Sequence, residues 1–264
     1  MFGLLDPTGR TDIPADSVTC AAHGVHALSV PTGTTVSDTA GIHWLERGNA
    51  EVIDEQARCL LEDMPVNAIK VGAVTCPETA SVIASIAADY SEAPLVLQLG
   101  PQENPDGEPD QDLDGGEIEP CVGATLEMLV PQARVVVVPS AAIGRWLNDE
   151  VLNNYSPADG PAALLTLGAS WALVTGYAQR PGSLVNLLLG PEGETIALPY
   201  QPTPDRLQDL SGLTSTALAC ALAKGMTVPE AAKIACSYSE QAAIDSFQAG
   251  MGQKLAGRTQ RSSP

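Results

Sequence analysis

Uninterrupted apolar runs, each closed by a turn residue, recur along the chain and constrain its fold more than any other feature. The clearest are residues 134–138 (Arg-Val-Val-Val-Val) and 95–99 (Leu-Val-Leu-Gln-Leu). Such runs are typical of parallel strands that are buried on both faces of a sheet. Segments with helical spacing lie between them, as in residues 51–62, so the sequence predicts an α/β fold around a mainly parallel sheet.

The same patterns predict the remaining elements. Strands are expected at residues 2–5, 25–30, 66–71, 171–175, 184–189 and 195–198, the last two joined as a hairpin by the turn 190–193. Helices are expected at residues 17–23, 80–90, 141–153 and 162–167, with a helix end at 125–129. Residues 33–42 are rich in Gly, Thr and Ser and are predicted to form a loop.

Length and composition favour one domain that covers residues 1–264. The chain is 44% hydrophobic but only 4% aromatic, which indicates a core of aliphatic side chains suited to a layered α/β fold. No fixed-period repeat divides it. Residues 101–119 hold eight acidic residues, three prolines and three glycines but no basic residue, so we expect an acidic surface loop there.

The net charge of −19 argues against two classes of partner. An acidic surface repels both phosphate backbones and anionic membranes, so neither nucleic acid nor a membrane is expected as a partner. No window is apolar and long enough for a membrane span, and the N-terminus is too short for a signal sequence. We expect a cytoplasmic protein.

The six cysteines are scattered, without a Cys-x-x-Cys pair, and are expected to be reduced. Cys59, Cys220 and Cys236 fall in apolar helical patterns and are predicted to be small core residues. The three histidines are irregularly spaced, so they are expected to be structural, and no metal site is predicted from side-chain spacing.

Residues 209–225 predict a helix that opens from a small-residue loop. Ser211 or Thr214 is expected to cap its start, and Gly225 to end it. The first turn of a helix presents unpaired N–H groups and the positive end of the helix dipole, which together suit an anion such as phosphate. The alternative is an ordinary buried helix whose small residues allow close packing.

Several stretches, in order along the chain, resemble one family. They are Asp6-Pro-Thr-Gly-Arg-Thr-Asp-Ile-Pro-Ala-Asp16, His23-Gly-Val-His-Ala-Leu-Ser-Val30, Asp63-Met-Pro-Val-Asn-Ala-Ile-Lys-Val-Gly72, Ala172-Leu-Val-Thr-Gly176, Leu222-Ala-Lys-Gly225 and Gly250-Met-Gly-Gln253. The chain thereby resembles the hydroxymethylpyrimidine/phosphomethylpyrimidine kinases of thiamine biosynthesis, within the ribokinase-like superfamily. The resemblance implies a three-layer α/β/α sandwich with a mostly parallel central sheet.

The resemblance also implies a site and its ligands. It implies MgATP-dependent phosphoryl transfer to a pyrimidine, and a homodimer. The implied positions are Asp6, Asp16, Ser37, Gly72 and Ala73 for substrate, Thr175 and Gly176 for nucleotide, Ser211, Gly212 and Leu213 for the anion hole, and Gly212 for the base.

Several of these positions depart from the family pattern. Gly212 stands where the family has a cysteine and related vitamin kinases have an aspartate base, and Asp209 replaces an anion-hole glycine while remaining a possible substitute base. The other departures are Ser37 for glutamine, Ala73 for methionine, Ile143 for a magnesium-binding glutamate, Arg10 and Asp12 for glycines, and Gln98-Leu99-Gly100 for an Asp-Pro-Val near the metal and nucleotide. Asp6, Asp16, Gly72 and Gly176 are retained.

These departures leave two hypotheses open. One is a divergent kinase that uses ATP and Mg²⁺. The other is a non-catalytic homologue that binds a small molecule, such as a pyrimidine, or a partner protein.

Three residues also carry open alternatives. Asp6 is either a site acid or a turn residue beside Thr8 and Gly9, and Asp16 is either a substrate ligand or a helix cap. Lys70 either extends to solvent or pairs with a carboxylate.

Overall fold

The computed structural model describes residues 1–100, 118–148, 160–204, 207 and 210–259. Most of the predicted acidic loop, residues 101–117, lies outside these residues, as does the end of the helix predicted at 141–153. Asp209 lies outside them too. None of the described helices is long and apolar enough to cross a membrane.

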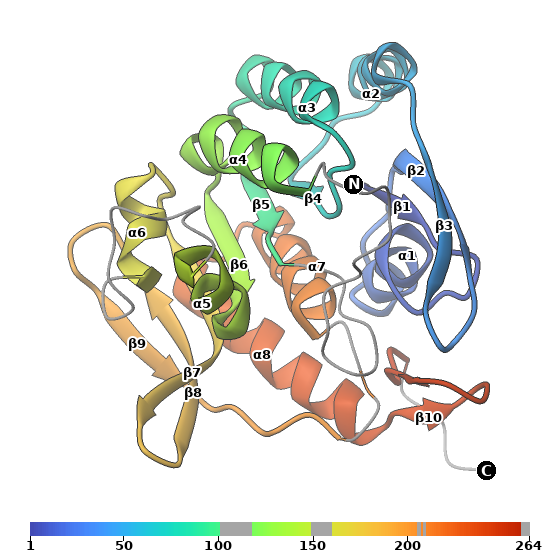
Figure 1. Cartoon of the computed structure of the whole chain (residues 1–264). Helices are drawn as coiled ribbons and strands as arrows, with labels where there is room; N and C mark the ends of the chain where they lie inside the picture. The colour runs from blue at the N-terminus through green and yellow to red at the C-terminus, as the bar shows by residue number, and fades with distance from the viewer. Residues whose placement is uncertain (101–117, 149–159, 205–206, 208–209, 260–264) are drawn as a thin grey trace.

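A nine-stranded sheet forms the centre of the fold, with strand order β3-β2-β1-β4-β5-β6-β7-β8-β9 (Figure 1). The strands are β1 (Phe2–Leu5), β2 (Val30–Ser37), β3 (Ile42–Arg47), β4 (Ile69–Val71), β5 (Leu95–Gln98), β6 (Val135–Pro139), β7 (Ala172–Arg180), β8 (Ser183–Leu189) and β9 (Thr195–Leu198). The six strands from β2 to β7 in this order pair in parallel. Only β3, β8 and β9 pair antiparallel, so the predicted mostly parallel sheet is confirmed.

Helices cover both faces of the sheet. One layer contains α2 (Ala50–Asp63), α3 (Pro77–Asp89), α4 (Ile118–Met128), α5 (Ser140–Asn148) and α6 (Gly160–Thr166); the other contains α1 (Asp12–Ala22), α7 (Leu210–Ala223) and α8 (Val228–Ile244). A short 3₁₀ turn, η1 (Val130–Gln132), precedes β6, and the small ribbon β10 (Phe247–Gln248) and β11 (Lys254–Leu255) follows α8. The predicted three-layer α/β/α sandwich is confirmed.

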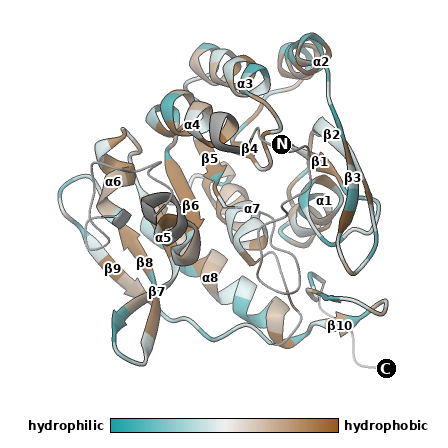
Figure 2. Cartoon of the chain, in the orientation of Figure 1, coloured by the Kyte–Doolittle hydropathy of each residue, from teal (hydrophilic) through white to brown (hydrophobic). Residues whose placement is uncertain are grey.

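The central strands show why uninterrupted apolar runs are needed. Successive side chains of β6 alternate between the two layers, so Val136 and Val138 join the core under α2–α6, while Val135 and Val137 join the core under α7 and α8. All four are fully buried. Figure 2 shows this as a hydrophobic centre in the sheet. A polar residue at any of these positions would lie in one core or the other.

Helix α7 is the most deeply buried helix of the described chain. Every residue from Gly212 to Leu222 is buried, between the sheet and α8. Its small residues allow this close approach, and Gly225, at φ +79°, ends the turn that follows it, as predicted.

The sequence prediction was wrong for the segment from residue 25 to residue 42. Residues 25–29 are not a strand, and the predicted loop at 33–42 instead forms most of the β2–β3 hairpin. Proline usually interrupts a strand, but β3 pairs with β2 only from Gly33 onward, so Pro31 has a neighbouring strand on one side only. The alternating threonines beyond it are good strand formers.

Helix boundaries and one cysteine also differ from the prediction. Helix α1 begins at Asp12 rather than Ser17, because Pro14 lies in the first turn, where no N–H donor is required. Residues 118–119, predicted to end the acidic loop, begin α4. Cys59 is exposed, whereas Cys220 and Cys236 are buried as predicted.

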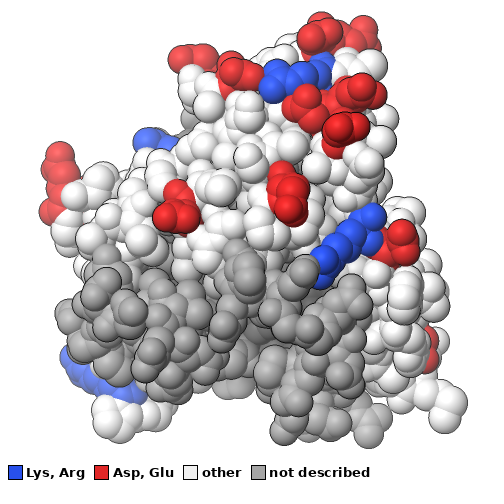
Figure 3. Space-filling view, turned by 45° about the horizontal axis from the view of Figure 1, so that its top comes forward, with Lys and Arg blue, Asp and Glu red and all other residues white. Residues whose placement is uncertain are grey.

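Acidic residues gather on the outer helices. Figure 3 shows them on the face where α2 and α3 lie, around a few basic side chains. Arg58 of α2 pairs there with Asp54 and with Asp89 of α3, both at 2.9 Å. Such exposed pairs contribute little stability, so this surface is chiefly a solvated, negatively charged exterior.

Gly33→Ala is expected to destabilise the protein by about 1–3 kcal/mol, the usual cost of overpacking. A Cβ at Gly33 would lie 2.7 Å from the backbone oxygen of Glu46, inside the β2–β3 ladder. Gly123→Ala is the matched control, because a Cβ there meets nothing within 4 Å and alanine favours the helix α4. Measured in urea, the free energy of unfolding should fall for Gly33→Ala and rise for Gly123→Ala. Equal changes in the two variants would contradict the packing argument.

Candidate active site

A cavity of about 450 Å³ lies at the carboxyl edge of the sheet, where ligands commonly bind in open α/β folds. Its lining comes from the ends of β5 and β6, the middle of β7, and the first turn of α7. The loop between β1 and α1, Asn186 of β8, the segment after β9 and the C-terminal half of α8 also contribute. The lining residues used below are Arg10, Thr11, Gln98, Ser140, Thr175, Gly176, Tyr200, Ser211, Thr214, Ser239 and Glu240.

The predicted nucleotide positions, Thr175 and Gly176, line this cavity. Gly176 takes φ +65°, and its carbonyl oxygen accepts a hydrogen bond of 2.8 Å from Ser140 Oγ. A Cβ at Gly176 would lie 3.3 Å from the ring of Tyr200. The position therefore favours glycine both by conformation and by the close approach of an aromatic ring.

The predicted anion-hole residues lie in the first turn of α7. Ser211 lines the cavity, whereas Gly212 and Leu213 are buried in the helix. The predicted caps were wrong: α7 already begins at Leu210, and Thr214 Oγ1 donates to the carbonyl oxygen of Leu210 at 2.6 Å. The first turn of a helix directs its N–H groups out of the helix start, so this end of α7 supplies a positive potential beside the cavity.

The predicted substrate positions lie elsewhere, and none lines the cavity. Asp6, Ser37, Gly72 and Ala73 lie at the ends of β1, β2 and β4, and Asp16 lies within α1. Asp6 organises the turn after β1: its carboxylate accepts hydrogen bonds from Thr8, Thr11 and Ser37, the last at 2.7 Å. Burial alone would raise the pKa of Asp6, but these hydrogen bonds lower it below its ordinary value. Asp6 therefore stabilises the turn after β1, which is one of its two predicted roles. Its role as a site acid stays a prediction.

Asp12 occupies the space beside the two other predicted substrate positions, Gly72 and Ala73. Its Oδ1 accepts from the N–H groups of Leu4 and Ala73 at 3.3 and 3.4 Å, and it would lie 3.0 Å from a Cβ on Gly72. Asp12 has φ +49°, a conformation that glycine adopts more readily. Burial raises the pKa of Asp12, the ammonium of Lys70 lowers it, and the nearby carboxylate of Asp16 raises it.

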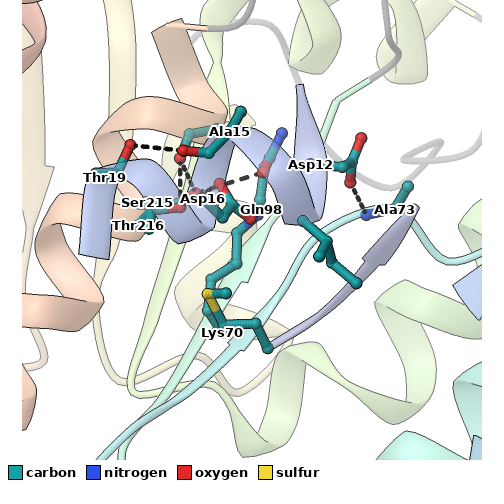
Figure 4. A network of polar contacts seen from close by, with 12 residues as sticks. Asp12, Ala15, Asp16, Thr19, Lys70, Ala73, Gln98, Ser215 and Thr216 are labelled. Atoms are coloured by element: carbon teal, nitrogen blue, oxygen red, sulfur yellow. Dashed lines mark hydrogen bonds and ion pairs between the residues drawn. The ribbon is translucent and has the colours of Figure 1, made fainter. Parts of the chain in front are cut away.

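Asp16 and Lys70 form a buried ion pair. Lys70 Nζ donates to Asp16 Oδ2 at 2.6 Å, each side chain is only 2% exposed, and Thr216 Oγ1 donates to Asp16 Oδ1 at 2.6 Å. Figure 4 shows these side chains converging from α1, β4 and α7. Of the two alternatives for Lys70, the carboxylate pair is confirmed. The helix-cap role for Asp16 was wrong, because Asp16 lies inside α1; its substrate role stays a prediction.

Ile143 replaces a magnesium-binding glutamate according to the family resemblance. Its side chain is buried in the core under α2–α6. The described residues contain no group of three His, Cys, Asp or Glu side chains that could hold a metal ion. Among the described lining residues, the charged side chains are Arg10 and Glu240.

Gln98 lines the cavity at the position that the resemblance places near the metal and nucleotide. Sequence analysis missed other lining residues, chiefly Tyr200, Ser239 and Glu240. Tyr200, Ser239 and Glu240 come from a loop and a helix far along the chain, and no local pattern marks them. The packing of α8 against α7, β8 and β9 brings Ser239 and Glu240 to the cavity, and the segment after β9 brings Tyr200.

Lys70→Met is expected to destabilise the protein by about 3–5 kcal/mol, because it leaves the buried Asp16 carboxylate without a cation. Adding Asp16→Asn should recover part of that loss. Lys233→Met is the control, since Lys233 is exposed on α8. The free energy of unfolding in urea measures all three, and a loss for Lys70→Met no greater than the control would contradict the pair's importance.

Sequence comparison finds related kinases over nearly the whole chain. Residues 6–101 and 115–256 match the model of the phosphomethylpyrimidine kinase family. The hydroxymethylpyrimidine/phosphomethylpyrimidine kinase of Streptomyces coelicolor is 28% identical over 249 residues, which cover 94% of this chain and 88% of the relative. The enzyme of the same name from Rhizobium meliloti is 29% identical over 255 residues, which cover 94% and 91% of the two chains.

Solved structures share the fold. Phosphomethylpyrimidine kinase from Clostridium difficile superposes with a TM-score of 0.72 at 22% identity, over 91% of this chain and 97% of that one. A Bacillus subtilis pyridoxal kinase, solved as an ADP complex, gives 0.75 at 18% identity, over 97% of each chain. The family model matches most of the chain, and the solved structures share its fold. The chain therefore belongs to the phosphomethylpyrimidine kinase family and has a ribokinase-like fold.

Proposed function

We propose that the chain catalyses ATP-dependent phosphoryl transfer to a hydroxymethylpyrimidine or its phosphate, at a reduced rate. The observation that carries this proposal is the cavity that joins Thr175 and Gly176 to the start of α7, in a chain that belongs to this kinase family. Nucleotide phosphates placed there would lie next to the positive end of a long helix, which favours anions. Phosphoryl transfer depends mainly on such positioning and charge stabilisation.

The cavity lining provides one described carboxylate, which suits an Mg²⁺ ion that is held mainly by the phosphates of the nucleotide. Mg²⁺ is commonly held by one or two carboxylates, phosphate oxygens and water. Glu240 is the carboxylate of the described lining and would be the protein ligand. The metal would neutralise charge on the transferred phosphate, while the backbone of the first turn of α7 would orient that phosphate.

The reduced rate follows from the base position. Gly212 has no side chain that could remove a proton from the substrate hydroxyl, and loss of a general base typically lowers a rate on the order of 10²–10⁴-fold. Asp209 lies outside the described residues and remains the proposed substitute base.

Purified protein with MgATP and either pyrimidine should consume ATP slowly, and Gly212→Cys should raise turnover by about 10²-fold, because it restores a proton acceptor next to Ser211. Gly123→Cys is the matched control, a glycine in helix α4 remote from the cavity. Circular dichroism should first show that both variants fold. No magnesium-dependent ATP consumption at high protein concentration would remove the kinase proposal.

A second candidate function is binding without catalysis. It is favoured by Asp12, whose buried carboxylate occupies the space beside Gly72 and Ala73, where the family resemblance implies that the pyrimidine binds. Asp12→Gly should open that space and remove an unfavourable positive φ, so calorimetry should detect tighter binding of hydroxymethylpyrimidine than in the unaltered chain. Unchanged affinity would argue that Asp12 does not block the ring.

We also propose that the chain forms a homodimer in the cytoplasm. The β2–β3 hairpin at the sheet edge exposes Val36 (60%) and Trp44 (58%), and an edge strand with exposed large apolar residues favours association. Sedimentation equilibrium would test the dimer; a monomer at micromolar concentration would contradict it.

A further inference from the structure

Arg10 is a buried cation that pairs with no carboxylate among the residues that the structure describes. It lies in the loop between β1 and α1, its side chain is 4% exposed, and it lines the cavity at the carboxyl edge. Its Nη1 donates to Gln253 Oε1 at 2.9 Å, and its Nε is buried without an acceptor. No carboxylate of the described residues forms an ion pair with it.

Two described carboxylates, those of Asp6 and Asp16, are bonded to residues other than Arg10. Asp6 accepts from Thr8, Thr11 and Ser37, and Asp16 pairs with Lys70. Glu240 is the acidic residue of the described cavity lining, but it forms no ion pair with Arg10.

A buried charge without a partner is strongly unfavourable. A bound ligand of opposite charge is therefore the simplest explanation for the burial of Arg10. The protein also holds Arg10 firmly in place. Gln253, which is fully buried, accepts from its guanidinium, and Arg258 Nη2 donates to its backbone oxygen at 2.7 Å. Both contacts reach across more than 240 residues of sequence. The loop is thus anchored beside the cavity that Arg10 lines.

Other donors border the same cavity. Thr11 and Ser211 line it, and Ser211 belongs to the first turn of α7, which directs its N–H groups and positive dipole end toward an anion. An arginine fork opposite a helix start is well suited to a phosphoryl group, because both provide planar or convergent N–H donors.

We propose that Arg10 binds the phosphoryl group of a phosphorylated ligand in this cavity, opposite the start of α7. This inference rests on the proposed function for the location of the ligand, and it names the ligand's charge. It also assigns a role to a residue that stands where the family resemblance places a glycine. The ligand enters with its own negative charge, which supplies the counter-ion that the described residues do not.

Inorganic phosphate is the first probe, measured by its effect on the thermal midpoint of the full chain at low ionic strength. Phosphate should raise the midpoint of the unaltered chain in a saturable way. Arg10→Gln should weaken phosphate binding at least about tenfold, the loss expected for a charged hydrogen bond. Arg134→Gln is the matched control, because Arg134 is exposed and does not line the cavity, and its binding should be unchanged.

The same series separates an anion site from a structural role. Without phosphate, Arg10→Gln should be at least as stable as the unaltered chain, because it removes an uncompensated buried charge; a structural arginine would make the variant less stable with or without phosphate. Arg10→Lys keeps the charge and should keep most of the binding, which covers the case in which Arg10→Gln fails to fold. Equal phosphate binding by Arg10→Gln and the unaltered chain would overturn the proposal.

Calorimetry with phosphomethylpyrimidine, neutral hydroxymethylpyrimidine and ATP then identifies the source of the phosphoryl group. The proposal expects Arg10→Gln to weaken the binding of a phosphorylated ligand and to leave neutral hydroxymethylpyrimidine unaffected. Arg10-dependent phosphate binding without any turnover would remove the kinase proposal and keep this one. Slow turnover, together with an equal effect of Arg10→Gln on the binding of charged and neutral ligands, would keep the kinase proposal and remove this one.

Discussion

The ion pair between Asp16 and Lys70 is the contact on which the candidate site depends. It joins α1 to β4, and Thr216 adds α7 through a second hydrogen bond to Asp16. In a nearly dry interior neither charge can be left alone without a large penalty, so the three elements keep one relative position. That position in turn places the loop before α1 and the first turn of α7 on the same edge of the sheet.

Charge is divided unevenly along this edge. At the end formed by β1 and β4, two buried carboxylates, Asp12 and Asp16, share the ammonium of Lys70. At the other end, Arg10 faces the cavity with no carboxylate paired to it among the described residues. A neutral ring and a phosphoryl group would therefore meet different environments within one site. Protein fills the space beside Gly72 and Ala73, whereas the cavity is open and has Arg10 and Glu240 as the charged side chains of its described lining.

The sequence predicted the parts of the fold that depend on local apolar pattern. Residues 134–138 and 95–99 formed central strands, because a run of Val and Leu can be buried on both faces only inside such a sheet. The β2–β3 hairpin was missed because Pro31 and Gly33 resemble breaks, although Pro31 lies where β3 has not yet begun to pair. The start of α1 was missed because Asp12 begins it at a positive φ that aspartate seldom adopts.

The sequence by itself determined the α/β class and the family resemblance, and it predicted a helix within residues 209–225. It also showed that Gly212 offers no side chain for proton transfer. Only the tertiary structure decided that Asp12 fills the space beside Gly72 and that Arg10 is buried with no counter-ion in the described part of the chain. These outcomes depend on partners such as Ala73 and Gln253, which lie 61 and 243 residues away along the chain. No local pattern encodes such a distance, because burial and charge pairing arise only when the layers close around the sheet.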